Sequence, residues 1–337
     1  MYHTKAGFYM IQSLNFPLEK EYAASCGGWA EIRKRLAALR LDGLEGIWAG
    51  VEEIPEDFPV DLLTGYHLTF FPDWVDLYLG NKKELERKFG SEEVIRSIYG
   101  GTDPECLLDV YRKDLDRARR MRAEYIVFHV SDVSLEEVHT YRWLHDDRTV
   151  LDASVMIIND LLKDIPPEFD FLVENQWWPG FTFTDPAKTD YLLSKISYPR
   201  TGIMLDTGHL MNTNPKIRTQ KEGVRYILDM LHAHGSLTES IKGMHFHQSI
   251  SGRYVRANTG KMPADSPEDY WDAFMMSYRH IQRIDRHRPW TDPTCRELIE
   301  AVRPEYLTHE LAASGIRQFA AAARQISTIR SSNSGNH

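Results

Sequence analysis

Short apolar runs alternate with longer amphipathic segments along most of the chain. Segments with apolar residues at three- and four-residue spacing, as in helices, cover 28–39, 106–122, 150–162, 221–232, 267–284 and 316–329. The short runs have the length of buried strands and cover 6–12, 43–48, 63–68, 124–130, 169–174, 201–206, 241–247 and 306–311. Strand followed by helix, repeated in this way, predicts a (β/α)8 TIM barrel. A doubly wound sheet is disfavoured, because neither GxGxxG nor GxxxxGK[ST] follows the first run.

The pattern also bears on domain organisation. No linker rich in proline, glycine and serine divides the chain, so we expect one barrel domain over 1–329 and a polar tail over 330–337. No run approaches the roughly 20 apolar residues of a membrane helix, and the first residues lack the apolar segment of a signal peptide. We therefore expect a cytoplasmic protein with no membrane partner.

Charge and composition narrow the choice of ligand. The 337 residues include 40 Lys+Arg and 49 Asp+Glu, a net charge of -9, which offers no general attraction to nucleic acid. We therefore do not expect a nucleic-acid partner. The 14 histidines suit metal binding, and the 8 tryptophans suit the walls of pockets for flat or sugar-like ligands.

Residues of metal-ligand type stand at the ends of six consecutive predicted strands. They are His67, His129, Glu174, Asp206 with His209, His245 with His247, and Glu310 preceded by His309. Active sites of such barrels lie at the C-terminal ends of the strands, so these side chains are expected to converge there. Imidazole and carboxylate without thiolate suit Zn²⁺, Mn²⁺, Co²⁺ or Mg²⁺. By strand alternation, His309 should point away from Glu310 and pack behind the site.

The order of these motifs resembles the xylose isomerase-like TIM barrel superfamily. The motifs are GYHL, VFHV, VENQ, LDTGH, MHFHQS, IDRH and HEL, which span His67 to Glu310. The superfamily contains sugar isomerases and epimerases as well as apurinic endonuclease IV, of AP endonuclease family 2. The resemblance therefore implies a metal-dependent enzyme of one of these two branches.

The two branches imply different ligand sets. In the tagatose epimerase-like branch one ion is held by Glu174, Asp206, His245 and Glu310, the two glutamates are catalytic, and His67, His129 and His209 bind substrate. In the endonuclease IV-like branch up to three zinc ions use nine ligands, which add His67, His129, His209, Asp285 and His287. Two departures concern the last pair. Gln248 stands where an Asp is common, and about forty residues separate His245 from Asp285, so Asp285 and His287 can also be read as a solvated helix end.

Aromatic and basic residues near the predicted site have two interpretations each. Trp177 and Trp178 follow Glu174 and predict either a wall that binds substrate or a subunit interface, which would make a homo-oligomer. The segment 248–267 contains Arg253, which is predicted to bind an anionic group of the substrate, with the segment closing as a lid, or else to be solvated.

The sequence favours a metal-dependent isomerase or epimerase of a sugar, sugar phosphate or related polyol. Glu174 and Glu310 would transfer a proton at a carbon beside a carbonyl that one divalent ion polarises. The alternative is an endonuclease IV-like multi-zinc phosphodiester hydrolase. A metal-binding barrel without catalysis is least expected, because so many ionisable residues are costly to keep without use. The expected partner is a small carbohydrate-like molecule.

Overall fold

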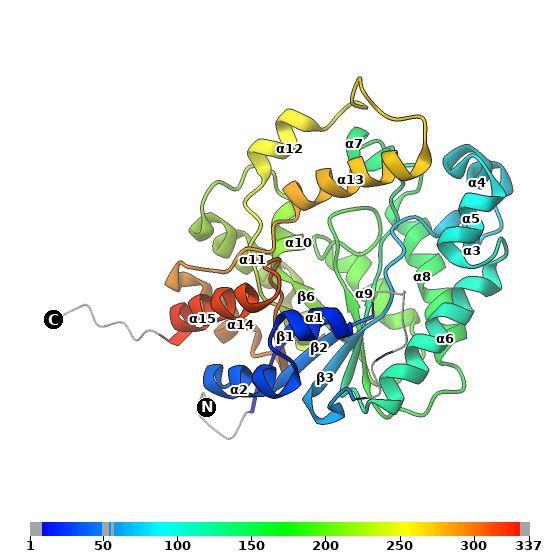
Figure 1. Cartoon of the computed structure of the whole chain (residues 1–337). Coiled ribbons are helices and arrows are strands. Elements are labelled where there is room, and N and C mark those ends of the chain that lie inside the picture. The colour runs from blue at the N-terminus through cyan, green and yellow to red at the C-terminus, as the bar shows by residue number, and fades with distance from the viewer. Residues whose placement is uncertain (1–8, 49–53, 55–56, 331–337) are drawn as a thin grey trace.

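The computed structural model describes residues 9–48, 54 and 57–330. Eight parallel strands close into a barrel in chain order, so that β1 pairs with both β2 and β8 (Figure 1). The strands are β1 (Ile11–Pro17), β2 (Gly43–Ile47), β3 (Leu63–His67), β4 (Tyr125–His129), β5 (Asp170–Glu174), β6 (Thr201–Asp206), β7 (Ile241–His245) and β8 (Tyr306–His309). The predicted (β/α)8 barrel is confirmed.

The first strand lies later than the sequence prediction placed it. We predicted 6–12, of which 6–8 fall outside the described residues, whereas β1 covers Ile11–Pro17. Leu14 is buried among side chains of the surrounding helices, while Ser13 hydrogen-bonds to a threonine of β3. The prediction was wrong because it relied on a continuous apolar run, and β1 alternates apolar and polar residues instead.

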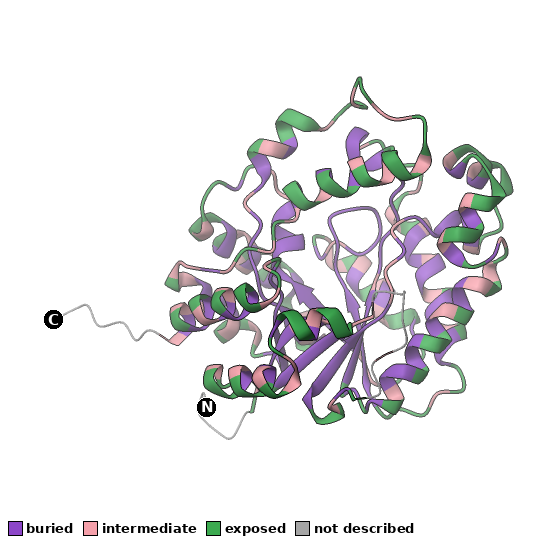
Figure 2. Cartoon of the chain, in the orientation of Figure 1, coloured by how far each residue is buried: buried purple, intermediate pink, exposed green. Residues whose placement is uncertain are grey.

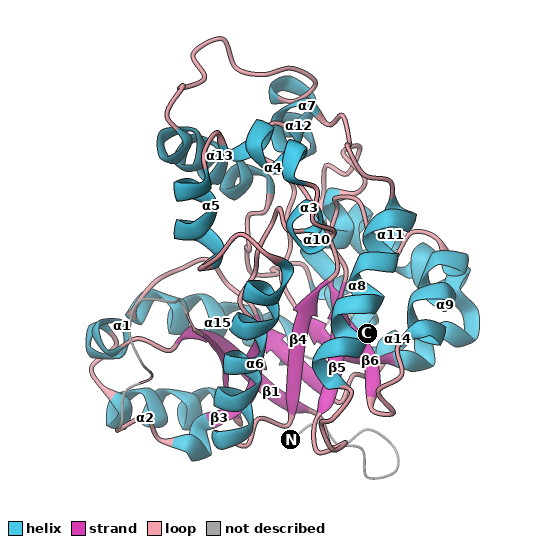
Figure 3. Cartoon of the chain, turned by 90° about the vertical axis from the view of Figure 1, so that its right-hand side faces the viewer, coloured by secondary structure: helices cyan, strands magenta, loops and turns pink. Residues whose placement is uncertain are grey.

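Helices surround the barrel and also extend beyond its mouth (Figure 3). They are α1 (Lys20–Ser25), α2 (Trp29–Leu39), α3 (Val75–Tyr78), α4 (Lys82–Phe89), α5 (Glu92–Tyr99), α6 (Pro104–Arg120), α7 (Glu137–Thr140), α8 (Asp147–Leu162), α9 (Pro186–Lys195), α10 (Thr207–Asn212), α11 (Gln220–His234), α12 (Gly252–Asn258), α13 (Tyr270–Ile284), α14 (Arg296–Val302) and α15 (Ile316–Arg330), with short 3-10 turns at Val60–Leu62, Gly235–Ser240 and Pro293–Cys295. Arg330, predicted to begin the polar tail, ends α15, and 331–337 lie outside the described residues. None of the described helices combines the length and apolar character that crossing a lipid bilayer requires.

The strands are buried along most of their length (Figure 2). Most of the core lies between the strands and the helices, a smaller cluster lies around Trp177 and Trp178, and an inner part lies inside the barrel. The inner part includes Tyr125, whose hydroxyl hydrogen-bonds to Glu45 and Thr308. Gly65 of the neighbouring strand makes room for this ring, since a Cβ at Gly65 would lie 2.1 Å from the Tyr125 Cζ atom. Side chains such as Tyr125 therefore fill the barrel interior at the N-terminal end of the strands. The polar side chains gather at the C-terminal end.

An insertion between β7 and Asp285 lies over the C-terminal mouth of the barrel (Figure 1). The segment 248–267 is not a plain loop, because it contains the helix α12, and α13 follows it. On α13, His280 hydrogen-bonds to the Val138 carbonyl oxygen of α7, and Ser277 bonds to His139. The insertion is thereby fixed to the β4–α8 connection.

Candidate metal centre

The predicted ligands converge because neighbouring strands end in register. His129 of β4 pairs with Glu174 of β5, and Asp206 of β6 pairs with His245 of β7. Consecutive parallel strands thus present their last side chains to the same mouth of the barrel. Glu174, Asp206 and His245 are fully buried there.

His67, His129 and Glu174 form the first group of ligand-type side chains. The Nε2 atoms of His67 and His129 lie 3.0 Å apart, and they lie 3.2 and 2.9 Å from Glu174 Oε2. The other ring nitrogen of His67, Nδ1, lies 2.8 Å from the Leu68 carbonyl oxygen, which orients the ring. Two imidazole nitrogens and one carboxylate oxygen therefore face a common point.

The second group contains Glu174, Asp206, His245 and Glu310, which offer ligand atoms within 4.8 Å of one another. His245 Nδ1 lies 3.2 Å from Glu310 Oε2, 3.4 Å from Glu174 Oε2 and 3.8 Å from Asp206 Oδ2. Asp206 also caps α10, since its Oδ1 accepts a hydrogen bond from the His209 backbone N–H. This cap leaves Asp206 Oδ2 directed into the group.

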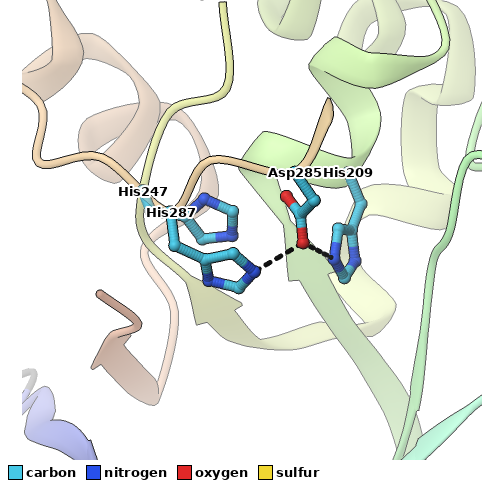
Figure 4. A group of neighbouring side chains, drawn as sticks. All are labelled: His209, His247, Asp285 and His287. Carbon is cyan, nitrogen blue, oxygen red and sulfur yellow. Dashed lines mark hydrogen bonds and ion pairs between the residues drawn. The ribbon is translucent and has the colours of Figure 1, made fainter. Parts of the chain in front are cut away.

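His209, His247, Asp285 and His287 form the third group (Figure 4). Asp285 Oδ2 lies 3.1 Å from His209 Nε2 and 2.5 Å from His287 Nε2. The rings of His247 and His287 stack with centroids 4.0 Å apart. Asp285 and His287 therefore lie beside the other predicted ligands despite the long insertion. Asp285 does stand at a helix end, as the C-cap of α13, but the pair is largely buried, so the reading of it as solvated is wrong.

The buried nitrogen and oxygen atoms of these groups are suited to bind divalent metal ions. His245 Nδ1 and Glu310 Oε2 are buried and make no hydrogen bond, although each is surrounded by atoms of ligand type. The ion pairs that Glu174, Asp206 and Glu310 form are with histidines. Several buried carboxylates side by side repel one another unless cations neutralise them, so the groups can hold divalent ions.

Burial and neighbouring charges have opposite effects on the pKa values of the residues in the centre. Burial lowers the pKa of His129 to about 4, even though Glu174 favours its charged form. Burial disfavours the charged ring of His287 too, yet Asp285 and Glu310 raise the pKa of His287 to about 9. Burial would raise the pKa of Asp206, but His209 and His247 lower it to about 2. Protons on these histidines occupy the lone pairs that a metal ion would use, so metal binding must release protons.

The ligand sets expected from the sequence did not include two residues that lie at the centre, Glu45 and His247. Glu45 of β2 lies beneath His245, with 2.9 Å between Glu45 Oε1 and His245 Nε2. His247 Nε2 lies 2.8 Å from Asp206 Oδ2. For His247 the signal was present, because residues two apart in extended chain face the same side as His245. For Glu45 the signal was a carboxylate inside the predicted buried strand 43–48, although nothing local indicates its partner on a distant strand.

The close packing around His247 depends on Gly208. A Cβ at Gly208 would lie 2.0 Å from the His247 Cε1 atom. The glycine of the LDTGH motif thus leaves the space in which the His247 ring stands between Asp206 and His287.

Of the predicted substrate-binding residues other than the histidines, Trp177 borders the third group, and Arg253 lies apart from the three groups. Trp177 and Trp178 are buried in a small cluster with Val138 of α7 and Val255 of α12, and only Trp177 is near a ligand residue, with its ring centroid 5.1 Å from that of His209. Arg253 is exposed on α12 and lines a hollow outside the centre. Their roles in substrate binding stay predictions.

His309 takes the position that strand alternation predicted. It is fully buried, and its Nδ1 atom lies 2.8 Å from Gln325 Nε2 of α15. Burial lowers the pKa of His309 to about 3, so the ring is neutral. His309 therefore packs behind Glu310.

Comparison with known proteins rests on structure alone. No family model and no curated protein sequence matches the chain. Endonuclease IV from Thermus thermophilus is similar with a TM-score of 0.54 and 13% identity, over 94% of this chain and 97% of that one. A xylose isomerase-like TIM barrel protein from Mycobacterium smegmatis, in complex with magnesium, has a TM-score of 0.50 and 12% identity, over 96% of this chain and 97% of that one.

The chain shares its TIM barrel fold with both of these proteins. The fold predicted from the motif order between His67 and Glu310 is thereby confirmed. Within the barrel, all nine ligand positions that the resemblance implied come together at the C-terminal mouth, with His247 as an addition.

Proposed function

We propose that the protein is a hydrolase of small phosphate esters that uses a centre of two or three divalent ions. The observation that carries the proposal is the position of Glu174, which belongs to both the first and the second group of ligands. A shared carboxylate is the arrangement that holds two ions close together. When bound, clustered divalent ions supply a nucleophile at neutral pH and neutralise charge on a transferring phosphoryl group.

The chain's own residues would hold and order this centre. His67, His129 and Glu174 would bind the first ion, and Glu174, Asp206, His245 and Glu310 the second. His209, His247, Asp285 and His287 would bind the third. The insertion with α12 and α13 covers the mouth, and the net charge of -9 disfavours polyanions, so a small substrate is proposed rather than a nucleic acid.

A metal-dependent isomerase or epimerase of a carbohydrate is the second candidate. It is favoured by the placement of Glu174 and Glu310, whose Oε2 atoms lie 3.4 and 3.2 Å from His245 Nδ1. Two carboxylates beside one ion position are what proton removal and return at a substrate carbon require. In that case one ion would suffice.

Metal content separates the two candidates. We expect the purified full chain to contain two or three divalent ions by elemental analysis, and His67→Ala and His287→Ala each to lose about one ion, because a ligand is removed from a partly exposed group. His232→Ala, at an exposed position of α11, is the control and should retain the full number. One ion per chain, unchanged in His67→Ala and His287→Ala, would reject the hydrolase and favour the isomerase. Hydrolysis of p-nitrophenyl phosphate is the matching activity assay.

A further inference from the structure

A cavity opens from the candidate metal centre along α13 and α15. Its volume is 1080 Å³, and Asp285, His287 and Glu310 form part of its wall. The remaining wall comes from β1, α1, α13, the segment 286–289, the β8–α15 connection and α15, including Tyr278 and Gln318. Because it begins at the centre, this cavity is the place where the part of a substrate that does not react would lie.

Three arginines in the wall of this cavity, Arg286, Arg288 and Arg324, form no ion pair within the described residues. Arg286 donates a hydrogen bond to the Ile250 carbonyl oxygen instead, which leaves two arginines without a partner in that part of the chain. Arg288 and Arg324 are exposed, and neither forms an ion pair within the described part of the chain. The carboxylates in the same wall, Asp285 and Glu310, face histidines instead. The protein has a net charge of -9, but arginines without an anionic partner produce a local positive potential beside this cavity.

The backbone that carries these arginines is held in place. Arg288 and Gln248 exchange two backbone hydrogen bonds of 2.8 and 3.1 Å. Gln325, next to Arg324, is fully buried, and its Oε1 atom accepts a hydrogen bond of 2.7 Å from the Trp290 backbone N–H. The segment with Arg288 and the helix with Arg324 are therefore held together. The backbone positions of both arginines are fixed beside the same cavity.

We propose that Arg288 and Arg324 bind a second anionic group of the substrate, a phosphate or a carboxylate, away from the bond that is hydrolysed. The inference rests on the proposed function, because it places the reacting phosphate at the metal centre and the second anion at the exposed side of the cavity. Guanidinium groups present planar, paired donors that suit either kind of oxyanion. The substrate class is then a phosphate ester that carries another negative charge.

Anion binding to metal-free protein tests the site without the reaction. The full chain is stripped of metal with a chelator, which is then removed by dialysis into metal-free buffer, and its fold is verified by near-ultraviolet circular dichroism. Inorganic phosphate is titrated and followed by phosphorus NMR. We expect saturable binding, weakened about tenfold or more in Arg288→Gln/Arg324→Gln. Arg225→Gln, at an exposed position of α11, is the matched control and should bind as the unaltered chain does.

Competition with succinate identifies the preferred anion. If only a large excess of succinate displaces phosphate, the site takes a phosphoryl group, and if succinate displaces it readily, the site takes a carboxylate. Absence of saturable phosphate and succinate binding, or equal binding by the double variant, overturns the inference. Since no metal is present, this result is independent of the metal count that tests the hydrolase.

Discussion

Glu45 and His245 lie 200 residues apart in the chain, and their side chains meet beneath the candidate metal centre. Glu45 Oε1 lies 2.9 Å from His245 Nε2, so the opposite nitrogen of the ring, Nδ1, faces the carboxylates of the second group. Glu45 Oε2 is itself held by the hydroxyls of Tyr125 and Thr308. A carboxylate behind a histidine fixes which ring nitrogen is free to bind a metal.

Glu45→Gln should weaken metal binding by roughly ten- to a hundredfold, because an amide orients and polarises the His245 ring less well than a carboxylate. Competition with a chromophoric chelator measures the dissociation constant. Asp170→Asn is the control, since Asp170 is a buried carboxylate that bonds to Lys242 and Tyr306 instead. Equal metal affinity in Glu45→Gln and the unaltered chain would contradict the role of Glu45.

His247→Ala should lower the metal content by about one ion, because it removes one member of the third group and a partner of Asp206. Gly208→Ala should have a similar effect without removing a ligand, since the added Cβ displaces the His247 ring. Elemental analysis of both variants measures the change. If both retain the full metal content, His247 is a packing residue only.

Removal of metal should leave the barrel folded. The core between strands and helices draws buried residues from Leu18 to Ile329, and burial of apolar surface supplies most of the stability. We expect the helical circular dichroism signal to persist in chelator, with a lower melting temperature, because each ion at a thousandfold excess over its Kd stabilises the native state by about 4 kcal/mol. Cooperative loss of the helical signal on chelation would show instead that the metal is structural.

Acid should loosen the contact between α7 and α13. Burial and the adjacent His280 lower the pKa of His139 to about 4, and burial lowers the pKa of His280. Unfolded histidines bind protons near pH 6.5, so between about pH 6.5 and 4 the unfolded chain holds more protons and stability falls as pH falls. His139 alone would account for about 2 kcal/mol, with allowance for solvent screening.

The pH dependence of His139→Gln tests this expectation. Urea unfolding at pH 7 and pH 5 should show a smaller loss of unfolding free energy in His139→Gln than in the unaltered chain, because glutamine does not titrate. The exposed His232 of α11 supplies the control, and His232→Gln should keep the full loss. An unchanged loss in His139→Gln would show that other groups set the acid sensitivity.

The alternation of strand-length and helix-length runs determined the barrel, because burial imposes different periods on the two kinds of element. Parallel strands also place their ends at one mouth, so Glu174, Asp206 and His245 could be brought together from sequence alone. The prediction of the first strand was wrong, because polar residues of β1 face the barrel interior and interrupt the apolar run.

Only the tertiary structure decided which side chains complete the centre. Glu45 reaches His245 because the closed barrel brings β2 and β7 within side-chain reach across its interior, and no local pattern records such a contact. Asp285 joins His209 because α12 and α13 fold back over the mouth, which makes the length of the insertion irrelevant. Sequence determines which residues end each element, whereas contacts between distant elements depend on how the whole barrel closes and packs.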